Sequence, residues 1–144
     1  MSFLNSMNIS ASALTATRLR MDVITENMAN SNTTRTENGE PYRRKYVVFQ
    51  EKVNDDEFAE FFNKAKTTAG GVRVVEIGTD MSEFKYDFNP MHPDADENGY
   101  VKYPNVEVVQ EMVDMMSAFR AYEANITALN SLKDMAVKTL DIGK

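Results

Sequence analysis

The sequence predicts an α+β fold, in which long N- and C-terminal helices pair as a coiled coil and a small antiparallel β-rich insert lies between them. Three observations predict it. Apolar residues recur at alternating spacings of four and three near both ends, the period changes to two between them, and Gly, Pro and Asn mark the changes. The expected divisions are an N-terminal assembly helix with its terminal cap (1–34), the β-rich insert (35–105) and a C-terminal assembly helix (106–144).

The N-terminal helix is expected to end near Asn30, because asparagine tolerates the left-handed conformation of a C-terminal cap. Its seam has coiled-coil spacing and consists of Phe3, Met7, Ser10, Leu14, Thr17, Met21, Ile24 and Met28. Ser10 and Thr17 weaken this seam, since they offer little apolar area to bury at about 25 cal/mol per Å². Small residues instead favour close packing against several helices.

The C-terminal helix is expected over residues 106–140, with Asn105 as its N-cap and Pro104 blocking extension backward. Its seam is longer and heavier: Val108, Met112, Met115, Phe119, Tyr122, Ile126, Leu129, Lys133, Ala136 and Leu140. A 3.5-residue repeat keeps one narrow stripe facing a partner helix. Periodicity leaves open whether the two helices pair within one molecule or in an assembly.

The insert is expected to form a short antiparallel sheet. Its first strand runs from Pro41 to Phe49, and alternation places one set of side chains on a single face: Tyr42, Arg44, Tyr46 and Val48. Further strands are expected at 72–77, 84–88 and 100–103, and Asn98-Gly99 favours a type I′ hairpin turn. Residues 55–66 are compatible with a short helix whose inward side chains are Phe58, Phe61 and Phe62.

Composition excludes several classes of function. The 144 residues include no cysteine, so disulfides and thiolate metal sites are impossible. A net charge of −6 argues against a nucleic-acid partner, which needs many Lys and Arg contacts. No segment approaches the ~20 apolar residues of a membrane span, so direct membrane insertion is not expected. Met1 to Thr17 lacks the charged and apolar regions of a cleaved secretory signal.

The sequence supports no catalytic, cofactor or metal site. Asp94, Asp96 and Asn98 reproduce the first half of a calcium-binding EF-hand loop, but its twelfth position, normally a bidentate Glu, is Asn105. We therefore expect a solvated turn there. His92 is the only histidine and has no nucleophile motif near it. The basic run 43–45 is interpreted as a charged strand edge that blocks unwanted sheet pairing, in preference to a site for an acidic partner.

Several runs resemble the flagellar basal-body rod protein family across nearly the whole chain. The most specific is Asn27-Met28-Ala29-Asn30-Ser31-Asn32-Thr33, and the C-terminal run from Val109 to Asn125 resembles the same family. Pro41 to Phe49 and residues 92–106 are most similar to a proximal subunit of the rod. Residues 53–69, an acidic and Phe-rich segment, depart from the family pattern.

The resemblance implies a structural subunit and no enzyme. It would polymerise through its terminal helices with other rod subunits and with itself, transmitting torque and forming the export conduit. Its expected location is the flagellum basal body, in the periplasm-spanning rod, after passage through the flagellar type III export apparatus without signal cleavage. The expected assembly interface comprises Leu14, Met21, Ile24, Asn27, Met28, Asn30, Met112, Met115, Phe119, Tyr122, Ile126 and Leu129.

The alternative is a soluble coiled-coil adaptor or an export-associated binding module. Such a protein would be a stable helical monomer or dimer in solution. A rod subunit is instead expected to keep loosely ordered ends until it polymerises.

Overall fold

The computed structural model describes residues 3–52 and 70–142 and confirms the α+β fold. The described elements are the helices α1 (Phe3–Ala29) and α3 (Val108–Ile142) and the strands β1 (Lys45–Glu51), β2 (Val72–Thr79), β3 (Lys85–Phe88) and β4 (Tyr100–Tyr103). The helix expected at 55–66, with Phe58, Phe61 and Phe62, lies outside the described residues.

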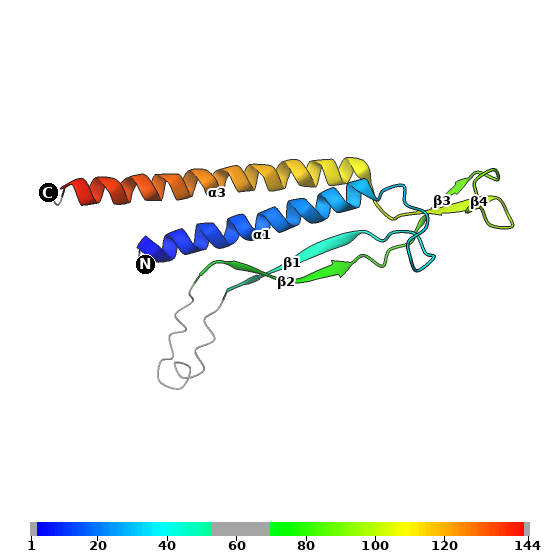
Figure 1. Ribbon diagram of the computed structural model, residues 1–144, viewed down its shortest axis with the longest axis horizontal. Helices are drawn as coiled ribbons and strands as arrows, with labels where there is room; N and C mark the ends of the chain where they lie inside the picture. The colour runs from blue at the N-terminus through cyan, green and yellow to red at the C-terminus, as the bar shows by residue number, and fades with distance from the viewer. Residues whose placement is uncertain (1–2, 53–69, 143–144) are drawn as a thin grey trace, which may run out of the picture.

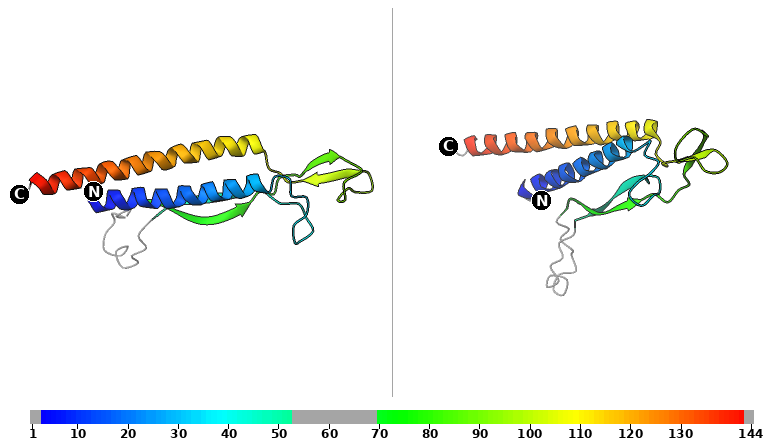
Figure 2. Two further views of the ribbon diagram at one scale, coloured as in Figure 1. Left: turned by 45° about the horizontal axis from the view of Figure 1, so that its top comes forward. Right: turned by 45° about the vertical axis from the view of Figure 1, so that its right-hand side comes forward.

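The two terminal helices lie side by side and antiparallel (Figure 1). A hydrogen bond between Asn27 and Glu111 sets their register near the C-terminal end of α1. The helix α3 has 35 residues and α1 has 27, so at a rise of about 1.5 Å per residue α3 is the longer helix. Its C-terminal end extends past the start of α1 in every view (Figures 1 and 2).

The helix α1 is the central element of the molecule. It packs against α3 on one flank and against β1 and β2 on another (Figure 2). Its buried residues are Ser10, Ala16, Val23, Ile24 and Asn27. Small buried residues, Ser10 and Ala16, allow this close packing. The Thr17 hydroxyl is satisfied within its own helix, because it donates to the carbonyl oxygen of Ala13 (2.7 Å).

Strands β1 and β2 form an antiparallel hairpin that lies along α1. Pairing runs from Lys45 opposite Thr79 to Glu51 opposite Val72, with a bulge between Val48 and Phe49. The first residues of β2 approach α1 closely, because the backbone N–H of Val72 donates to the Ser12 hydroxyl oxygen (3.1 Å). The glycines just before β2 make this approach possible.

Strands β3 and β4 form a second antiparallel pair, so the described part of the insert contains two small sheets and not one. This pair projects beyond the end of the paired helices (Figure 1). Val101 on β4 is fully buried, whereas Tyr86 and Phe88 on β3 are exposed. Phe88 and Tyr100 pack edge to face with their ring centroids 5.3 Å apart.

Three local predictions were wrong: the start of the first strand, the type I′ turn at Asn98-Gly99 and the N-cap at Asn105. The first strand begins at Lys45, because the backbone N–H groups of Tyr42 and Arg44 donate outside the sheet, to the Thr33 carbonyl oxygen and to the Asn105 side chain. Asn98 does not have the positive φ of a type I′ turn. Among the described residues only glycines have a positive φ, and Gly99 is one of them, with a φ of +83°. The Gly99 N–H donates to the Asp96 carbonyl oxygen (2.9 Å). That pattern belongs to a longer hairpin loop.

Asn105 is not the N-cap of α3, which begins at Val108. Its side-chain oxygen accepts the backbone N–H of Arg44 (2.8 Å), and its amide nitrogen donates to the Asp80 carbonyl oxygen (3.0 Å). Asn105 therefore links the segment before α3 to the residue that precedes β1 and to the residue that follows β2.

Candidate assembly surfaces

A buried polar cluster joins α1, β1 and α3 where the helices meet the insert. We call it the junction network and define it as Asn27, Tyr42, Arg44, Lys45 and Glu111. The side chains of Asn27 and Glu111 are 1% and 0% exposed. Buried polar groups are costly unless they are hydrogen-bonded, so the completeness of this cluster decides its effect on stability.

Asn27 makes all four hydrogen bonds available to its side chain. Its amide nitrogen donates to the Lys45 carbonyl oxygen (2.8 Å) and to Glu111 Oε2 (3.1 Å). Its amide oxygen accepts from the Tyr42 hydroxyl (2.9 Å) and from the Lys45 backbone N–H (2.9 Å). One side chain thus connects the end of α1 to the backbone of β1 and to the first turn of α3.

The buried carboxylate of Glu111 is paired with a cation. Arg44 Nε donates to Glu111 Oε1 at 2.6 Å, and Arg44 Nη2 lies 3.6 Å from the carboxylate of Asp114. Because a buried charge without its partner is strongly unfavourable, this pair fixes where the insert meets α3. Burial, together with the nearby carboxylates of Glu26 and Glu111, raises the pKa of Tyr42 to about 12.

The basic run 43–45 makes internal contacts and is not a free charged edge. Arg44 belongs to the junction network, Lys45 forms an ion pair with Glu26, and the Arg43 guanidinium lies over the Phe84 ring, 4.1 Å from its centroid. All three cations contact groups of their own chain, and Arg43 and Arg44 precede the first residue of β1. The interpretation of this run as a charged strand edge was therefore wrong.

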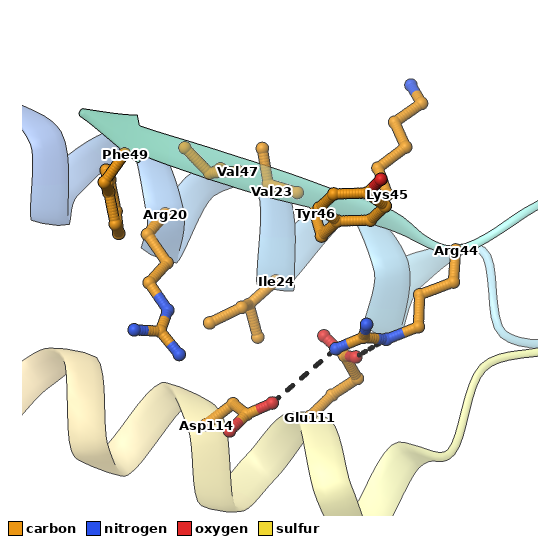
Figure 3. A pocket seen from close by; sticks show the side chains of 10 residues that line it. All are labelled: Arg20, Val23, Ile24, Arg44, Lys45, Tyr46, Val47, Phe49, Glu111 and Asp114. Carbon is orange, nitrogen blue, oxygen red and sulfur yellow. Dashed lines mark hydrogen bonds and ion pairs between the residues drawn. The ribbon is translucent and has the colours of Figure 1, made fainter. Parts of the chain in front are cut away.

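A groove opens beside the junction network (Figure 3). Its volume is about 210 Å³, and α1, β1 and α3 all line it. Val23 and Ile24 of α1 form its floor, with Phe49 and Tyr46 on the β1 side and Asp114 on the α3 side (Figure 3). A groove of this size is smaller than the roughly 300–1,000 Å³ of small-molecule sites.

The helix α3 carries two separate stripes. The inward seam consists of positions that are buried or half-buried and repeats with alternating spacings of three and four: Glu111, Met115, Ala118, Tyr122, Asn125 and Leu129. Among the described elements α3 packs on α1 alone, so this seam is the one that α1 covers.

The outward stripe lies next to the inward seam and remains exposed. It consists of Val109, Met112, Met116, Phe119 and Ile126, with Glu123 between the last two. Met112 is 50% exposed, Phe119 52% and Ile126 36%. A continuous apolar stripe of this kind is unusual on the surface of a monomeric protein and marks an interaction surface.

The residues expected at an assembly interface therefore divide into two groups on α3. Met115, Tyr122 and Leu129 belong to the inward seam, whereas Met112, Phe119 and Ile126 belong to the outward stripe. The sequence pattern placed both groups on one seam, because residues 115, 122 and 129 and residues 112, 119 and 126 each recur every seven positions and together fit a single coiled-coil repeat.

The expected interface residues on α1 are all covered to some degree. Ile24 and Asn27 are buried, and Leu14, Met21, Met28 and Asn30 are half-buried. Asn30 serves its own helix end, where its amide nitrogen donates to the Glu26 carbonyl oxygen (3.0 Å). The structure brings only Asn27 of this group into the junction network.

The acidic turn considered as a calcium loop uses its carboxylates on protein groups. Asp94 forms an ion pair with Arg35 (2.8 Å) and accepts from the Thr34 hydroxyl. Asp96 Oδ1 accepts the backbone N–H groups of Asn98 and Tyr100. Within 3–52 and 70–142, no cluster of three or more His, Cys, Asp or Glu residues has a metal-binding arrangement.

Sequence reasoning missed the functional partners of Asn27. Arg44 was interpreted as part of a strand edge, and no sequence motif connected Glu111 to Asn27. One available signal was the position of Glu111 on the apolar seam face, three residues after Val108 and four before Met115. A charged residue there needs a buried partner, which a single sequence does not name.

The paired terminal helices, the insert between them and the uncovered stripe define a structural class of protein. Residues 7–35 match the family described as flagella basal body rod protein, and residues 97–142 match the flagellar basal body rod FlgEFG protein C-terminal family. The described part of the chain contains no helix long and apolar enough to cross a membrane.

Individual relatives match the chain from end to end. The flagellar basal-body rod protein FlgC of Bacillus subtilis (strain 168) is 47% identical over all of both chains. That of Borreliella burgdorferi is 46% identical over 99% of this chain and 98% of its own length, and that of Escherichia coli O6:H1 is 43% identical over all of both. The chain belongs to the FlgC family of flagellar basal-body rod proteins, which are structural subunits.

Proposed function

We propose that this chain polymerises through α1 and α3, with other rod subunits and with copies of itself, to form part of the wall of the flagellar basal-body rod. The observation that carries this proposal is the outward stripe on α3, which stays exposed although α1 already fills the inward seam. A helix that needed only an intramolecular partner would bury one stripe and present polar residues elsewhere.

Torque transmission is the mechanical part of the proposal. A rod subunit must carry force between its helices and its insert without letting one slip against the other. The junction network supports this role, because Asn27, Arg44 and Glu111 connect α1, the start of β1 and α3 through hydrogen bonds, two of which involve the Glu111 carboxylate and are therefore charge-assisted. Many such contacts acting together around a tube resist twisting.

Export before assembly is the second part of the proposal. We infer that the chain reaches the periplasm-spanning rod through the flagellar type III export apparatus, unfolded and with no segment cleaved. Its composition supports this route, because a chain with no cysteine has no disulfide to constrain the unfolded state. Folding against neighbouring subunits would then follow transport, and the tube so formed would serve as the conduit.

The three parts of the chain predicted from the sequence each have a role in the proposed assembly. Residues 1–34 and 106–144 would supply the assembly helices, and residues 35–105 would supply the insert that the junction network fixes to them. The proposed assembly interface keeps the twelve residues predicted from the sequence. The inward members hold α1 against α3 within a subunit, and the outward members Met112, Phe119 and Ile126 contact neighbours.

Mass spectrometry of detergent-extracted, purified hook–basal bodies from the bacterium that encodes the chain tests this proposal. We expect the chain in multiple copies per basal body, with its first and last peptides present. A chain found only in the soluble fraction as a stable monomer or dimer would favour a coiled-coil adaptor or an export-associated module. A chain that is present but shortened at its start would refute uncleaved export.

A further inference from the structure

We propose that the groove beside the junction network receives the outward stripe of a second copy, so that Glu123 of one subunit pairs with Arg20 of the next. This inference rests on the proposed function and names the partner of its assembly surface. Its basis is the fit between two surfaces of the same chain, which the molecule cannot bring together by itself.

The groove is built to take large apolar side chains. Val23 and Ile24 supply an apolar floor, and Tyr46 and Phe49 supply aromatic side chains on the β1 side (Figure 3). Tyr46 and Phe49 are exposed in the single subunit. Its volume of about 210 Å³ suits side chains from a helix better than a separate small molecule.

Arg20 gives the groove a charge that the described residues leave unmatched. Its guanidinium extends across the groove toward α3 (Figure 3). The two other cations at the groove are paired, Arg44 with Glu111 and Lys45 with Glu26. Arg20 has no ion pair within residues 3–52 and 70–142. A partner that brings a carboxylate between apolar side chains would therefore complete the site.

The outward stripe of α3 has that composition. Phe119, Glu123 and Ile126 lie at positions i, i+4 and i+7, so they share one helix face. Glu123 is exposed and, like Arg20, makes no ion pair in the described part of the chain. It is also the only acidic residue on the stripe between Val109 and Ile126.

The stripe and the groove lie on opposite flanks of α3. At 3.6 residues per turn, Asp114, which lines the groove, is about 60° to one side of Glu111, and Phe119 is about 80° to the other. One subunit therefore cannot fill its own groove with its own stripe. A contact between unlike surfaces of identical chains is heterologous, and it continues from subunit to subunit around a ring or helix.

Engineered cysteines test this contact, because the natural chain has none and every disulfide would be new. Two single variants, Phe49→Cys in the groove and Ile126→Cys on the stripe, are co-expressed in the bacterium, and its purified basal bodies are oxidised. We expect a disulfide-linked dimer that contains one chain of each variant. The matched control replaces Ile126→Cys by Thr15→Cys, at an exposed position of α1, and should give no dimer.

Charge reversal tests the ion pair in the same preparation. Arg20→Glu or Glu123→Arg, each added to both cysteine variants, should lower the dimer yield about tenfold, the effect of about 1.4 kcal/mol. Combining the two reversals should restore most of the yield. Arg18→Glu, on the exposed face of α1 two residues away, should leave the yield unchanged.

The outcomes separate this inference from the proposed function. If the chain is present in basal bodies but Phe49→Cys and Ile126→Cys form no disulfide with each other, the groove contact is refuted and the rod role remains. Linkage of the groove cysteine to a different rod protein would also refute pairing with a second copy. If the chain is missing from basal bodies even without substitutions, the proposed function itself fails.

Discussion

At the scale of single residues, Asn27 decides how the helices and the insert fit together. Its four hydrogen bonds reach two segments far away in the sequence, β1 and the first turn of α3. The sequence marks Asn27 only through its place in a motif of the rod family. Its partners are identified only by the structure: the place of Glu111 on the apolar seam face indicates that it needs a buried partner, but a single sequence does not show that the partners are Asn27 and Arg44.

Replacing Asn27 by alanine should destabilise the fold. The substitution leaves the Tyr42 hydroxyl, the Lys45 backbone and one Glu111 oxygen without a partner, and we expect a loss of about 3 kcal/mol in the free energy of unfolding. Denaturant unfolding of the purified chain measures this. Asn30→Ala is the matched control and should cost less than about 1 kcal/mol, since Asn30 bonds only near its own helix end. Equal losses in the two variants would contradict the role of the network.

Tyr42 gives the network a dependence on alkaline pH. Burial and two nearby carboxylates raise its pKa from 10.0 to about 12, so the folded chain keeps a proton that the unfolded chain releases in this range. Stability from this group is therefore complete below pH 10 and is lost as pH rises toward 12. Ultraviolet titration of tyrosinate should show a component above pH 10 that Tyr42→Phe removes. A titration curve that Tyr42→Phe leaves unchanged in this range would refute this environment.

At the scale of elements, periodicity predicted both helices and the strands at 72–77, 84–88 and 100–103 correctly, because these features depend on local spacing. It could not assign Met115 and Phe119 to different stripes, since the 3.5-residue repeat allows two adjacent registers on α3. Nor could it place Asn105, whose side chain binds Arg44 and Asp80 instead of capping a helix. The groove depends on the packing of three elements and has no sequence signature.

Gly71 allows β2 to lie close to α1, because it has no Cβ. It has a φ of +110°, and a Cβ there would lie 2.6 Å from the Ser12 hydroxyl oxygen. Gly71→Ala should therefore cost about 2–3 kcal/mol in the free energy of unfolding, from backbone strain and the clash together. Gly39→Ala is the control for strain alone, because Gly39 has a φ of +77° and no atom within 4 Å of the added Cβ. The packing of β2 on α1 would be contradicted if Gly71→Ala cost no more than Gly39→Ala.

At the scale of the whole molecule, the described part of the chain is elongated, with α1 and α3 side by side and the β3–β4 pair beyond one end of them (Figures 1 and 2). The central helix α1 holds the hairpin and α3 together, and the second stripe of α3 remains available. Folding and assembly thus use different faces of the same helix. Substitutions on the two stripes should therefore have separable effects.

The most direct test compares Phe119→Asp with Met115→Asp, by thermal unfolding of the purified chains and by their incorporation into purified basal bodies. Phe119→Asp places a carboxylate on an exposed stripe, so we expect the unfolding temperature of the free subunit to be unchanged and incorporation to be lost. Met115→Asp buries an unpaired carboxylate in the inward seam and should lower the unfolding temperature as well. Normal incorporation of Phe119→Asp would contradict the claim that the outward stripe of α3 builds the rod.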